Sequence, residues 1–328
     1  MKNKKFWKGK AVLVTGYEGF LGSNLTRRLI SLDAKVVGLD INVRRKKTIL
    51  CSSDYQKIVV IKGSVANFNL VKNIIEKYKI EIVFHLAAEA IVGKCLQNPR
   101  VAFSSNIKGS WELLEACRNT KTVKSIVVAS SDKAYGSWKK LPYKENTPLR
   151  GEHPYDVSKS CTDLIAYSYF HTFGLPVAIT RCGNIYGPGD FNFNRLVPDA
   201  IRCALTDRQL LIRSNGKFIR DYIFVEDIVN GYIILAEKFQ KLKLGGEAFN
   251  FSNEKPIPVL KLVKIIYKSF NKKQTFRVLN QAKYEIRMQY LSSKKSKSIL
   301  GWQPRYPLEE GIYRTIDWYR IYFNRESK

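Results

Sequence analysis

Short apolar runs alternate with amphipathic segments through the first half of the chain. Apolar, β-branched runs indicate buried strands, and apolar residues that recur every three or four positions indicate helices packed on a sheet. Strands are predicted at residues 11–15, 35–40, 58–62, 82–85, 125–130 and 176–181. Helices are predicted between them at residues 19–32, 68–78, 101–118 and 155–173. This alternation predicts an α/β fold with a doubly wound parallel sheet.

The regular alternation ends near Arg181. Loops rich in Gly, Pro and Asn are predicted at residues 183–194 and 245–258, and helices at residues 197–205, 225–239 and 258–270. We therefore expect a Rossmann-type nucleotide-binding domain at residues 1–181, to which part of 222–250 returns, and a smaller C-terminal substrate-binding lobe at residues 182–328. Residues 320–328 are predicted to form a frayed basic end.

The composition is that of a folded protein with an unusual excess of positive charge. Hydrophobic residues make up 45% and charged residues 26% of the 328 residues, which excludes a chain disordered throughout and a small disulfide scaffold. The net charge is +28. Because the lysines are spread along the chain, we interpret most of this charge as solvated surface and expect no nucleic-acid partner. A non-catalytic scaffold that binds RNA or phosphate is the alternative from another class.

No metal site, secretory leader or membrane span is predicted. The six cysteines lie at wide, irregular spacings without a CxxC pair, so neither a zinc site nor a disulfide framework is expected. The longest apolar windows fall short of the roughly 18 residues that a membrane span requires, and the apolar run behind the basic start is too short for a signal peptide. We expect a cytoplasmic protein with reduced thiols and no membrane partner.

A glycine-rich turn joins the first strand to the first helix: Thr15-Gly16-Tyr17-Glu18-Gly19-Phe20-Leu21-Gly22. Such glycines permit a tight turn and let a pyrophosphate approach the free N–H groups of the helix. The second strand ends in Asp40, 18 residues after Gly22, where a carboxylate accepts hydrogen bonds from an adenosine ribose. We predict NAD rather than NADP, because Asp40 repels a 2′-phosphate. The basic run 44–47 is either solvated surface or a site for that phosphate.

A tyrosine and a lysine lie near the start of a later helix. Tyr155 and Lys159 share one helix face, and the ammonium is expected to lower the pKa of the phenol so that Tyr155 can take a hydroxyl proton. Ser130 and Ser131 follow the fifth strand, at the edge of the sheet where ligands bind in this architecture. These residues predict acid–base chemistry on a hydroxyl group beside the dinucleotide.

Taken together, these motifs resemble the extended short-chain dehydrogenase/reductase family of nucleotide-sugar enzymes, the NAD-dependent epimerases and dehydratases. The resemblance covers nearly the whole chain. It rests on the glycine turn, Asp40, His85-Leu86-Ala87-Ala88, Ser130-Ser131-Asp132, the Tyr155 and Lys159 pair, and Arg181-Cys182-Gly183-Asn184-Ile185-Tyr186-Gly187-Pro188-Gly189. Within that family, the Asp132-Lys133 pair is most similar to the CDP-glucose 4,6-dehydratase branch.

The resemblance implies a 4,6-dehydratase cycle that converts CDP-glucose to CDP-4-keto-6-deoxyglucose. Ser131 and Tyr155 would hold the sugar C4 hydroxyl, and Tyr155 would remove its proton. Asp132 would be the acid that helps the C6 hydroxyl leave as water, and Lys133 the base at C5, where related dehydratases more often carry glutamate. A salt bridge between Lys133 and Asp132 is the alternative, and it would leave a nucleotide-sugar 4-epimerase or 4-dehydrogenase.

The resemblance also assigns the remaining contacts. The implied cofactor residues are Gly16, Gly19, Phe20, Leu21, Gly22, Asp40, Leu86, Ala87, Tyr155 and Lys159. The implied substrate residues are Ser131, Asn184, Arg195 and Arg220, whereas Arg213 is interpreted as surface. Ser64 departs from the family, which usually has aspartate there, so an altered adenine contact is expected. Residues 101–118 and 155–173 would pair across the two-fold axis of a homodimer.

Overall fold

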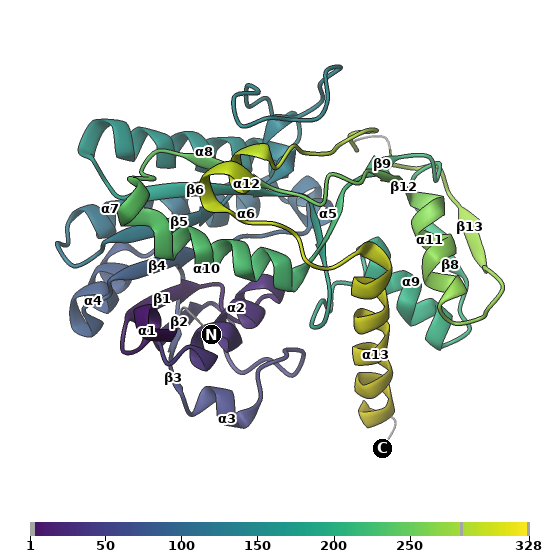
Figure 1. Cartoon of the computed structure of the whole chain (residues 1–328), viewed down its shortest axis with the longest axis horizontal. Coiled ribbons are helices and arrows are strands. Elements are labelled where there is room, and N and C mark those ends of the chain that lie inside the picture. Colours follow the sequence, from purple (N-terminus) through teal and green to yellow (C-terminus); the bar gives the residue numbers. More distant parts are fainter. Residues whose placement is uncertain (1–3, 283–284, 327–328) are drawn as a thin grey trace.

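The chain folds around a seven-stranded parallel sheet, as seen in a computed structural model that describes residues 4–282 and 285–326 (Figure 1). The strand order is β11-β6-β5-β4-β1-β2-β3. The strands are β1 (Ala11–Thr15), β2 (Lys35–Asp40), β3 (Ile58–Lys62), β4 (Ile82–His85), β5 (Ser125–Ala129), β6 (Val177–Cys182) and β11 (Ala248–Phe251). This order reverses direction between β1 and β4, which is where ligands bind in doubly wound folds.

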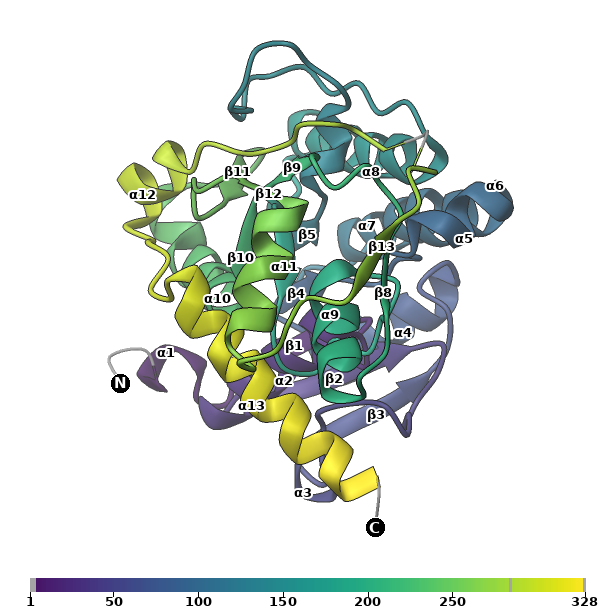
Figure 2. The same ribbon diagram turned by 90° about the vertical axis from the view of Figure 1, so that its right-hand side faces the viewer.

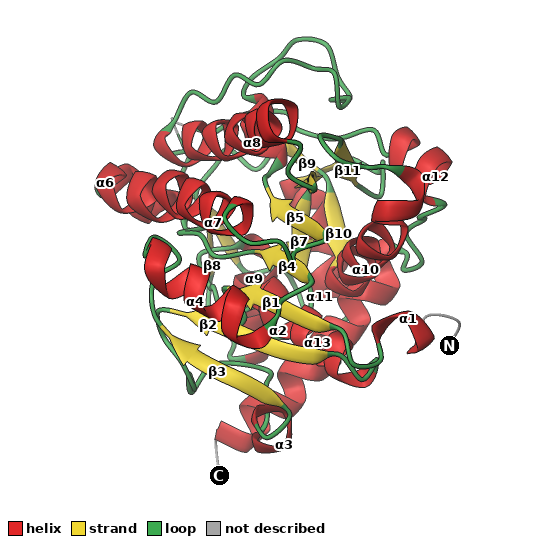
Figure 3. Cartoon of the chain, turned by 90° about the vertical axis from the view of Figure 1, so that its left-hand side faces the viewer, coloured by secondary structure: helices red, strands yellow, loops and turns green. Residues whose placement is uncertain are grey.

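Helices cover both faces of the sheet (Figure 3). α2 (Phe20–Ser31) and α10 (Val225–Leu242) pack on one face, and α4 (Phe68–Tyr78), α7 (Gly109–Arg118) and α8 (Pro154–Phe173) on the other. The central strands can therefore be apolar at consecutive positions, as in β1, where Val12, Leu13 and Val14 are all buried. α8 begins at Pro154 and ends before Gly174, which has a φ of 64° and closes the helix in the left-handed conformation.

A smaller lobe lies beside the carboxyl ends of the strands (Figure 2). It is built from α9 (Leu196–Leu205), α11 (Val259–Lys268) and α13 (Leu308–Glu326), which share one apolar core. Three two-stranded sheets accompany them: β7 (Asn184–Tyr186) with β10 (Tyr222–Phe224), β8 (Leu210–Ile212) with β13 (Phe276–Val278), and β9 (Ile219–Arg220) with β12 (Ile257–Pro258). Other short helices are α1 (Lys4–Trp7), α3 (Ser52–Tyr55), α5 (Val92–Gln97) and α12 (Lys294–Leu300).

The predicted fold class is confirmed, and the sheet has one strand more than the pattern indicated. The segment 245–258, predicted as a loop, contains β11, which pairs in parallel with β6. β11 is short and carries a polar residue, Asn250, so the apolar pattern does not reveal it. Its burial comes from pairing with β6, which is a tertiary effect.

The helix predicted at 101–118 is interrupted. The chain forms α6 (Pro99–Ala102), then a π-helical segment, η1 (Phe103–Lys108), and then α7. The buried Asn106 side chain in η1 donates to the Ser158 hydroxyl at 2.9 Å and accepts from the Glu89 backbone N–H at 2.7 Å. The π-helical segment is only six residues long, which is too short for hydrophobic periodicity to distinguish it from an α-helix.

The prediction of a frayed end at 320–328 is wrong for the residues that are described. α13 continues to Glu326, and residues 327–328 lie outside the described part. Ile312, Ile316 and Tyr319 are buried in the core of the smaller lobe and hold the helix in place. Within residues 4–282 and 285–326, the helices lack the combination of length and apolarity that crossing a bilayer requires.

Candidate active site

A cleft of about 1410 Å³ opens between the carboxyl ends of the strands and the smaller lobe. This volume exceeds the roughly 300–1,000 Å³ of an ordinary ligand pocket, and it suits a dinucleotide together with a second ligand. All the predicted site residues except Lys159 line this cleft. Tertiary folding therefore brings into one place residues that lie as far apart in the sequence as Gly16 and Arg220.

The glycine turn forms a cradle at the start of α2. Gly16 has a φ of 71°, and a Cβ atom there would lie 2.8 Å from the backbone of Ala87. A Cβ on Gly22 would lie 2.1 Å from the carbonyl oxygen of Gly16. No side chain caps the N-terminus of α2, so the N–H groups of its first turn face the cleft beside Phe20 and Leu21. These features fit a bound pyrophosphate of a dinucleotide.

Asp40 stands at the end of β2 and is already engaged by its neighbours. Its carboxylate accepts from the Asn42 backbone N–H at 3.1 Å and forms an ion pair with Arg45 at 2.7 Å. Within the basic run 44–47, Arg45 lines the cleft, whereas Arg44 lies over the Tyr55 ring at 5.2 Å. Because Asp40 neutralises Arg45, the charge at this corner is balanced rather than strongly positive.

The catalytic corner joins the end of β5 to the first turns of α8. Ser131 caps the 3-10 turn η2 (Asp132–Tyr135) and accepts from the Lys133 backbone N–H at 3.2 Å. Tyr155 and Lys159 lie on α8 as predicted, and the Lys159 ammonium donates to the carbonyl oxygen of Ala129 at 2.8 Å. Burial lowers the pKa of Lys159 to about 8.

Tyr155 does not have the lowered pKa that the sequence analysis predicts. Burial raises the pKa of the Tyr155 phenol. The Arg195 guanidinium and a hydrogen bond with Ser131 oppose this rise, whereas the Lys159 ammonium is directed to a backbone carbonyl. Arg195, predicted only as a substrate contact, is therefore the main cation that acts on the phenol.

Asp132 and Lys133 are adjacent but are not ion-paired among the described residues. Asp132 is buried, and its Oδ1 accepts from the Ser131 hydroxyl at 3.1 Å. Burial raises the pKa of this carboxyl, which favours the protonated form that a general acid needs. The Lys133 ammonium instead donates to Oε1 of Gln289 at 3.3 Å, so the alternative of an Asp132 salt bridge does not describe this structure.

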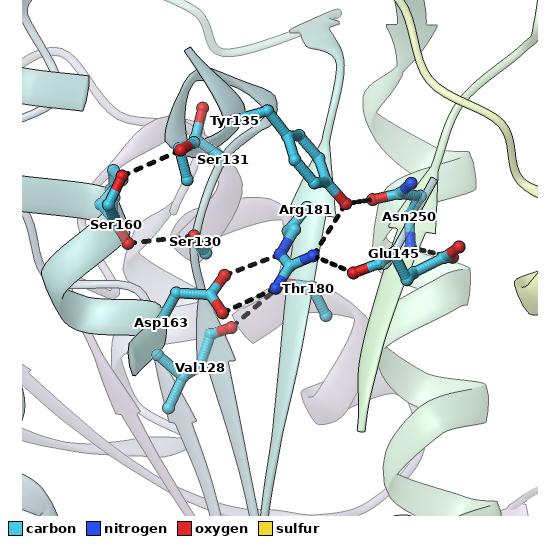
Figure 4. Close-up of polar contacts among 12 residues, drawn as sticks. Val128, Ser130, Ser131, Tyr135, Glu145, Ser160, Asp163, Thr180, Arg181 and Asn250 are labelled. Carbon is cyan, nitrogen blue, oxygen red and sulfur yellow. Dashed lines mark hydrogen bonds and ion pairs between the residues drawn. The ribbon is translucent and has the colours of Figure 1, made fainter. Parts of the chain in front are cut away.

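A buried polar network holds the turn that carries Asp132 and Lys133 (Figure 4). Arg181 pairs with Asp163 through two hydrogen bonds of 2.7 and 2.8 Å, and its third nitrogen donates to the Tyr135 hydroxyl at 2.8 Å. The Tyr135 hydroxyl donates in turn to Asn250 on β11 at 2.8 Å. The turn is thus connected by hydrogen bonds to β6, α8 and β11.

The substrate side of the cleft carries the predicted amide and guanidinium groups. Asn184 lines it with a buried Nδ2 atom that has no partner among the described residues. Arg220 is buried and pairs with Glu285 at 3.3 Å, and Arg195 pairs with Asp190 at 3.2 Å. Arg213, interpreted as surface, is exposed, and it also borders the cleft.

Other positions agree with or add to the sequence analysis. His85 is buried between Thr15 and Ser110, and burial lowers its pKa to about 3, as suits a packed neutral residue. Ser64 lines the cleft in place of the usual aspartate. Sequence reasoning missed Asp156, whose pKa burial raises to about 6, and Gln289. Asp156 lies inside the motif that named its neighbour, whereas no local signal marks Gln289, 156 residues from Lys133.

Comparison with known proteins identifies the family. Residues 13–315 match the family described as GDP-mannose 4,6 dehydratase. The chain is 30% identical to CDP-glucose 4,6-dehydratase of Salmonella typhimurium, with 100% of this chain and 95% of that protein covered. It is 31% identical to UDP-glucuronate 4-epimerase of Thermodesulfobacterium geofontis, over 93% of this chain and 95% of that protein.

A solved structure agrees with the sequence relatives. The dTDP-glucose 4,6-dehydratase of Streptomyces venezuelae, with NAD and TYD bound, superposes with a TM-score of 0.87 at 25% identity, covering 96% of this chain and 98% of that chain. The two chains therefore share the fold built on the parallel sheet described above. The chain therefore belongs to the GDP-mannose 4,6 dehydratase family, among the extended short-chain dehydrogenases/reductases that include nucleotide-sugar 4,6-dehydratases and 4-epimerases.

Proposed function

We propose that this protein is an NAD-dependent nucleotide-sugar 4,6-dehydratase with CDP-glucose as its first candidate substrate. The observation that carries the proposal is the Asp132 and Lys133 corner, in which a buried carboxyl with a raised pKa stands beside an amine that is not paired with it. The CDP-glucose 4,6-dehydratase relative, aligned over the whole chain, supports the choice of nucleotide. We also propose a domain boundary at residue 181. Residues 1–181, with part of 222–250, would form the cofactor-binding domain, and residues 182–328 would contribute most of the substrate-binding residues.

The cradle residues, Asp40, and Lys159 would hold NAD. When bound, this cofactor would supply the reversible two-electron oxidation that the reaction needs at C4 and C6. Tyr155 removes the proton of the C4 hydroxyl, and Arg195 and the Ser131 hydroxyl stabilise the phenolate that accepts it. Ser131 also holds the C4 oxygen in place.

Elimination of water follows on the 4-ketone, which acidifies the C5 hydrogen. Neutral Lys133 removes the C5 proton while Asp132 gives its proton to the C6 hydroxyl, which leaves as water. After hydride arrives at C6, Lys133 returns its proton to C5. The proton that Tyr155 took from the C4 hydroxyl is released to solvent, and Asp132 regains a proton from solvent, so both groups return to their starting states. The sum is loss of one water, with the sugar left as a 4-keto-6-deoxyhexose.

A nucleotide-sugar 4-epimerase is the second candidate, because the UDP-glucuronate 4-epimerase relative is as similar as the dehydratase relative. An epimerase needs Tyr155 and the cofactor but does not need Asp132 and Lys133 to act at C6 and C5. The two activities therefore share their first step and differ only in whether water is lost.

The deciding experiment is a screen of CDP-, GDP-, UDP- and dTDP-hexoses with mass spectrometry for loss of water. The same reactions run in deuterated water report the proton exchange at C5 that marks elimination. Tyr155→Phe is the inactive control. A stereoisomer formed without loss of water from any of these sugars would overturn the dehydratase proposal in favour of the epimerase.

We further propose a homodimer through α7 and α8. Their outer faces carry large exposed hydrophobic side chains, namely Trp111, Leu164, Tyr167 and Phe173. Leu164 is 56% and Phe173 52% exposed, which is costly for a lone chain in water. Two such helices from each subunit form a self-complementary four-helix interface.

A further inference from the structure

The partner of Lys133 is a glutamine from the far end of the sequence. The Lys133 ammonium donates to Oε1 of Gln289 at 3.3 Å, and the Gln289 side chain is fully buried. Lys133 lines the cleft, whereas Gln289 does not and lies behind it. Gln289 therefore contacts the proposed base from the protein side and leaves its cleft side open.

The backbone around Gln289 is held on both sides. Its N–H donates to the carbonyl oxygen of Ile219 at 3.2 Å. The next residue, Tyr290, accepts from the Tyr143 N–H at 3.0 Å, and Ser292 donates back to Tyr143 at 2.8 Å. The turn that carries Lys133 is fixed independently by the Tyr135 and Arg181 network (Figure 4). The Lys133 to Gln289 contact is thus imposed by two rigid segments.

The amide of Gln289 has an unused donor. Its Nε2 atom is buried without a partner among the described residues, as are Asp132 Oδ2 and Asp221 Oδ1. An amide accepts a hydrogen bond from an ammonium and, after rotation, donates one to the lone pair of a neutral amine. A carboxylate at this position only accepts, and it stabilises the ammonium alone.

We propose that Gln289 is a positioning residue that holds the Lys133 amine toward C5 of the sugar in both its protonated and its neutral state. This inference rests on the proposed dehydratase function. A base that cycles between ammonium and amine in each turnover needs a partner that suits both forms. Gln289 is that partner, and it acts on elimination without acting on the oxidation at C4.

The charges around the pair make a neutral partner necessary. The carboxyls that interact electrostatically with the Lys133 ammonium are Asp132 and Asp156, and the groups that interact in turn with Asp132 are Asp221, Arg220, Tyr143 and Tyr155. Three of these groups are carboxyls. A further carboxylate in place of Gln289 would shift the balance toward the ammonium and hold Lys133 in the form that cannot take a proton.

The test compares Gln289→Glu and Gln289→Met with the wild-type holoenzyme in single turnovers of CDP-glucose. C4 oxidation is followed by the absorbance of enzyme-bound reduced nicotinamide, and elimination by deuterium uptake at C5 from the solvent. We expect oxidation to stay within about twofold of wild type and elimination to slow by about tenfold to a hundredfold, so that reduced cofactor accumulates. Gln289→Glu, but not Gln289→Met, should also move the acidic limb of the kcat profile to higher pH.

Gln303→Glu is the matched control, since Gln303 is exposed and does not line the cleft. Gln289→Asn and thermal melting of every variant separate positioning from misfolding, because a partly unfolded enzyme loses both steps together. Equal loss of oxidation and elimination in the variants that fold, or no loss of either, overturns the inference. Failure of the wild type to dehydrate any sugar overturns the proposed function instead, so the two failures are distinguishable.

Discussion

The buried ion pair between Arg181 and Asp163 provides a quantitative test of how the active-site turn is supported. Asp163 accepts two hydrogen bonds from the Arg181 guanidinium, whose side chain is 7% exposed, and the Asp163 side chain is 3% exposed. In Asp163→Asn, the shape of the side chain is retained while the countercharge is removed. One N–H of Arg181 then faces a donor instead of an acceptor, and the guanidinium charge stays buried without a partner.

Breaking a buried pair from one side costs about 3–5 kcal/mol in the free energy of unfolding. For a chain of 328 residues, a loss at the lower end of that range corresponds to a fall of about 4 °C in Tm. Urea denaturation followed by circular dichroism measures the first quantity, and calorimetry the second. Because Arg181 also donates to Tyr135, dehydratase activity should fall at temperatures where the variant is still folded.

The control is Glu310→Gln, which removes an exposed ion pair with Arg314 on α13. Exposed pairs of this kind contribute about 0.5 kcal/mol or less. If Asp163→Asn loses less than about 1 kcal/mol, or no more than this control, the pair does not hold the turn in the way described. The positioning of Asp132 and Lys133 would then have to depend on other contacts.

Three further predictions follow from the geometry. Gly22→Ala places a Cβ 2.1 Å from the Gly16 carbonyl oxygen, so NAD affinity measured by fluorescence titration should fall by at least tenfold. In the control Gly93→Ala, the new Cβ meets no atom within 4 Å, and NAD affinity should stay normal. Equal affinities in the two variants would contradict the proposed role of the glycine turn as a pyrophosphate cradle. Asp156 has its pKa raised to about 6 by burial, so the folded state binds its proton more tightly than the unfolded state, and stability is lost as pH rises from about 4 to 6. Asp156→Asn should therefore melt at a higher temperature than wild type above pH 6 and no differently near pH 4, and a constant difference across this range would show that burial is not the cause. Leu164→Asp places a charge on the proposed dimer face and should give a monomer in light scattering. Leu211→Asp, at a similarly exposed leucine on β8, should remain a dimer. Dimers in both variants would exclude the α7 and α8 interface.

Much of the site could be predicted from the sequence because its chemistry is carried by local motifs. The glycine turn comes at the end of β1 and Asp40 is the last residue of β2, and both strands have a clear apolar pattern. The carboxyl ends of parallel strands meet at one edge of the sheet. Tyr155 and Lys159 are likewise placed together by helix geometry alone. For these residues, local structure is enough to determine which side chains share a surface.

The contacts that depend on long-range packing could not be predicted in this way. Burial, rather than the neighbouring lysine, has the largest effect on the pKa of Tyr155. The guanidinium that opposes this rise belongs to Arg195, which comes from the smaller lobe. β11 became a strand only by pairing with β6, and α13 was held to Glu326 only by its core.

The sequence by itself therefore indicated six of the seven strands of the sheet, the glycine turn and the groups proposed to be catalytic, since each is encoded within a few consecutive residues. The tertiary structure alone decided what surrounds those groups. It brought Gln289 to Lys133 and left Asp132 buried without an ion pair to any other described residue. No hydrophobic periodicity along the chain predicts such contacts, because they depend on how two separately folded segments pack.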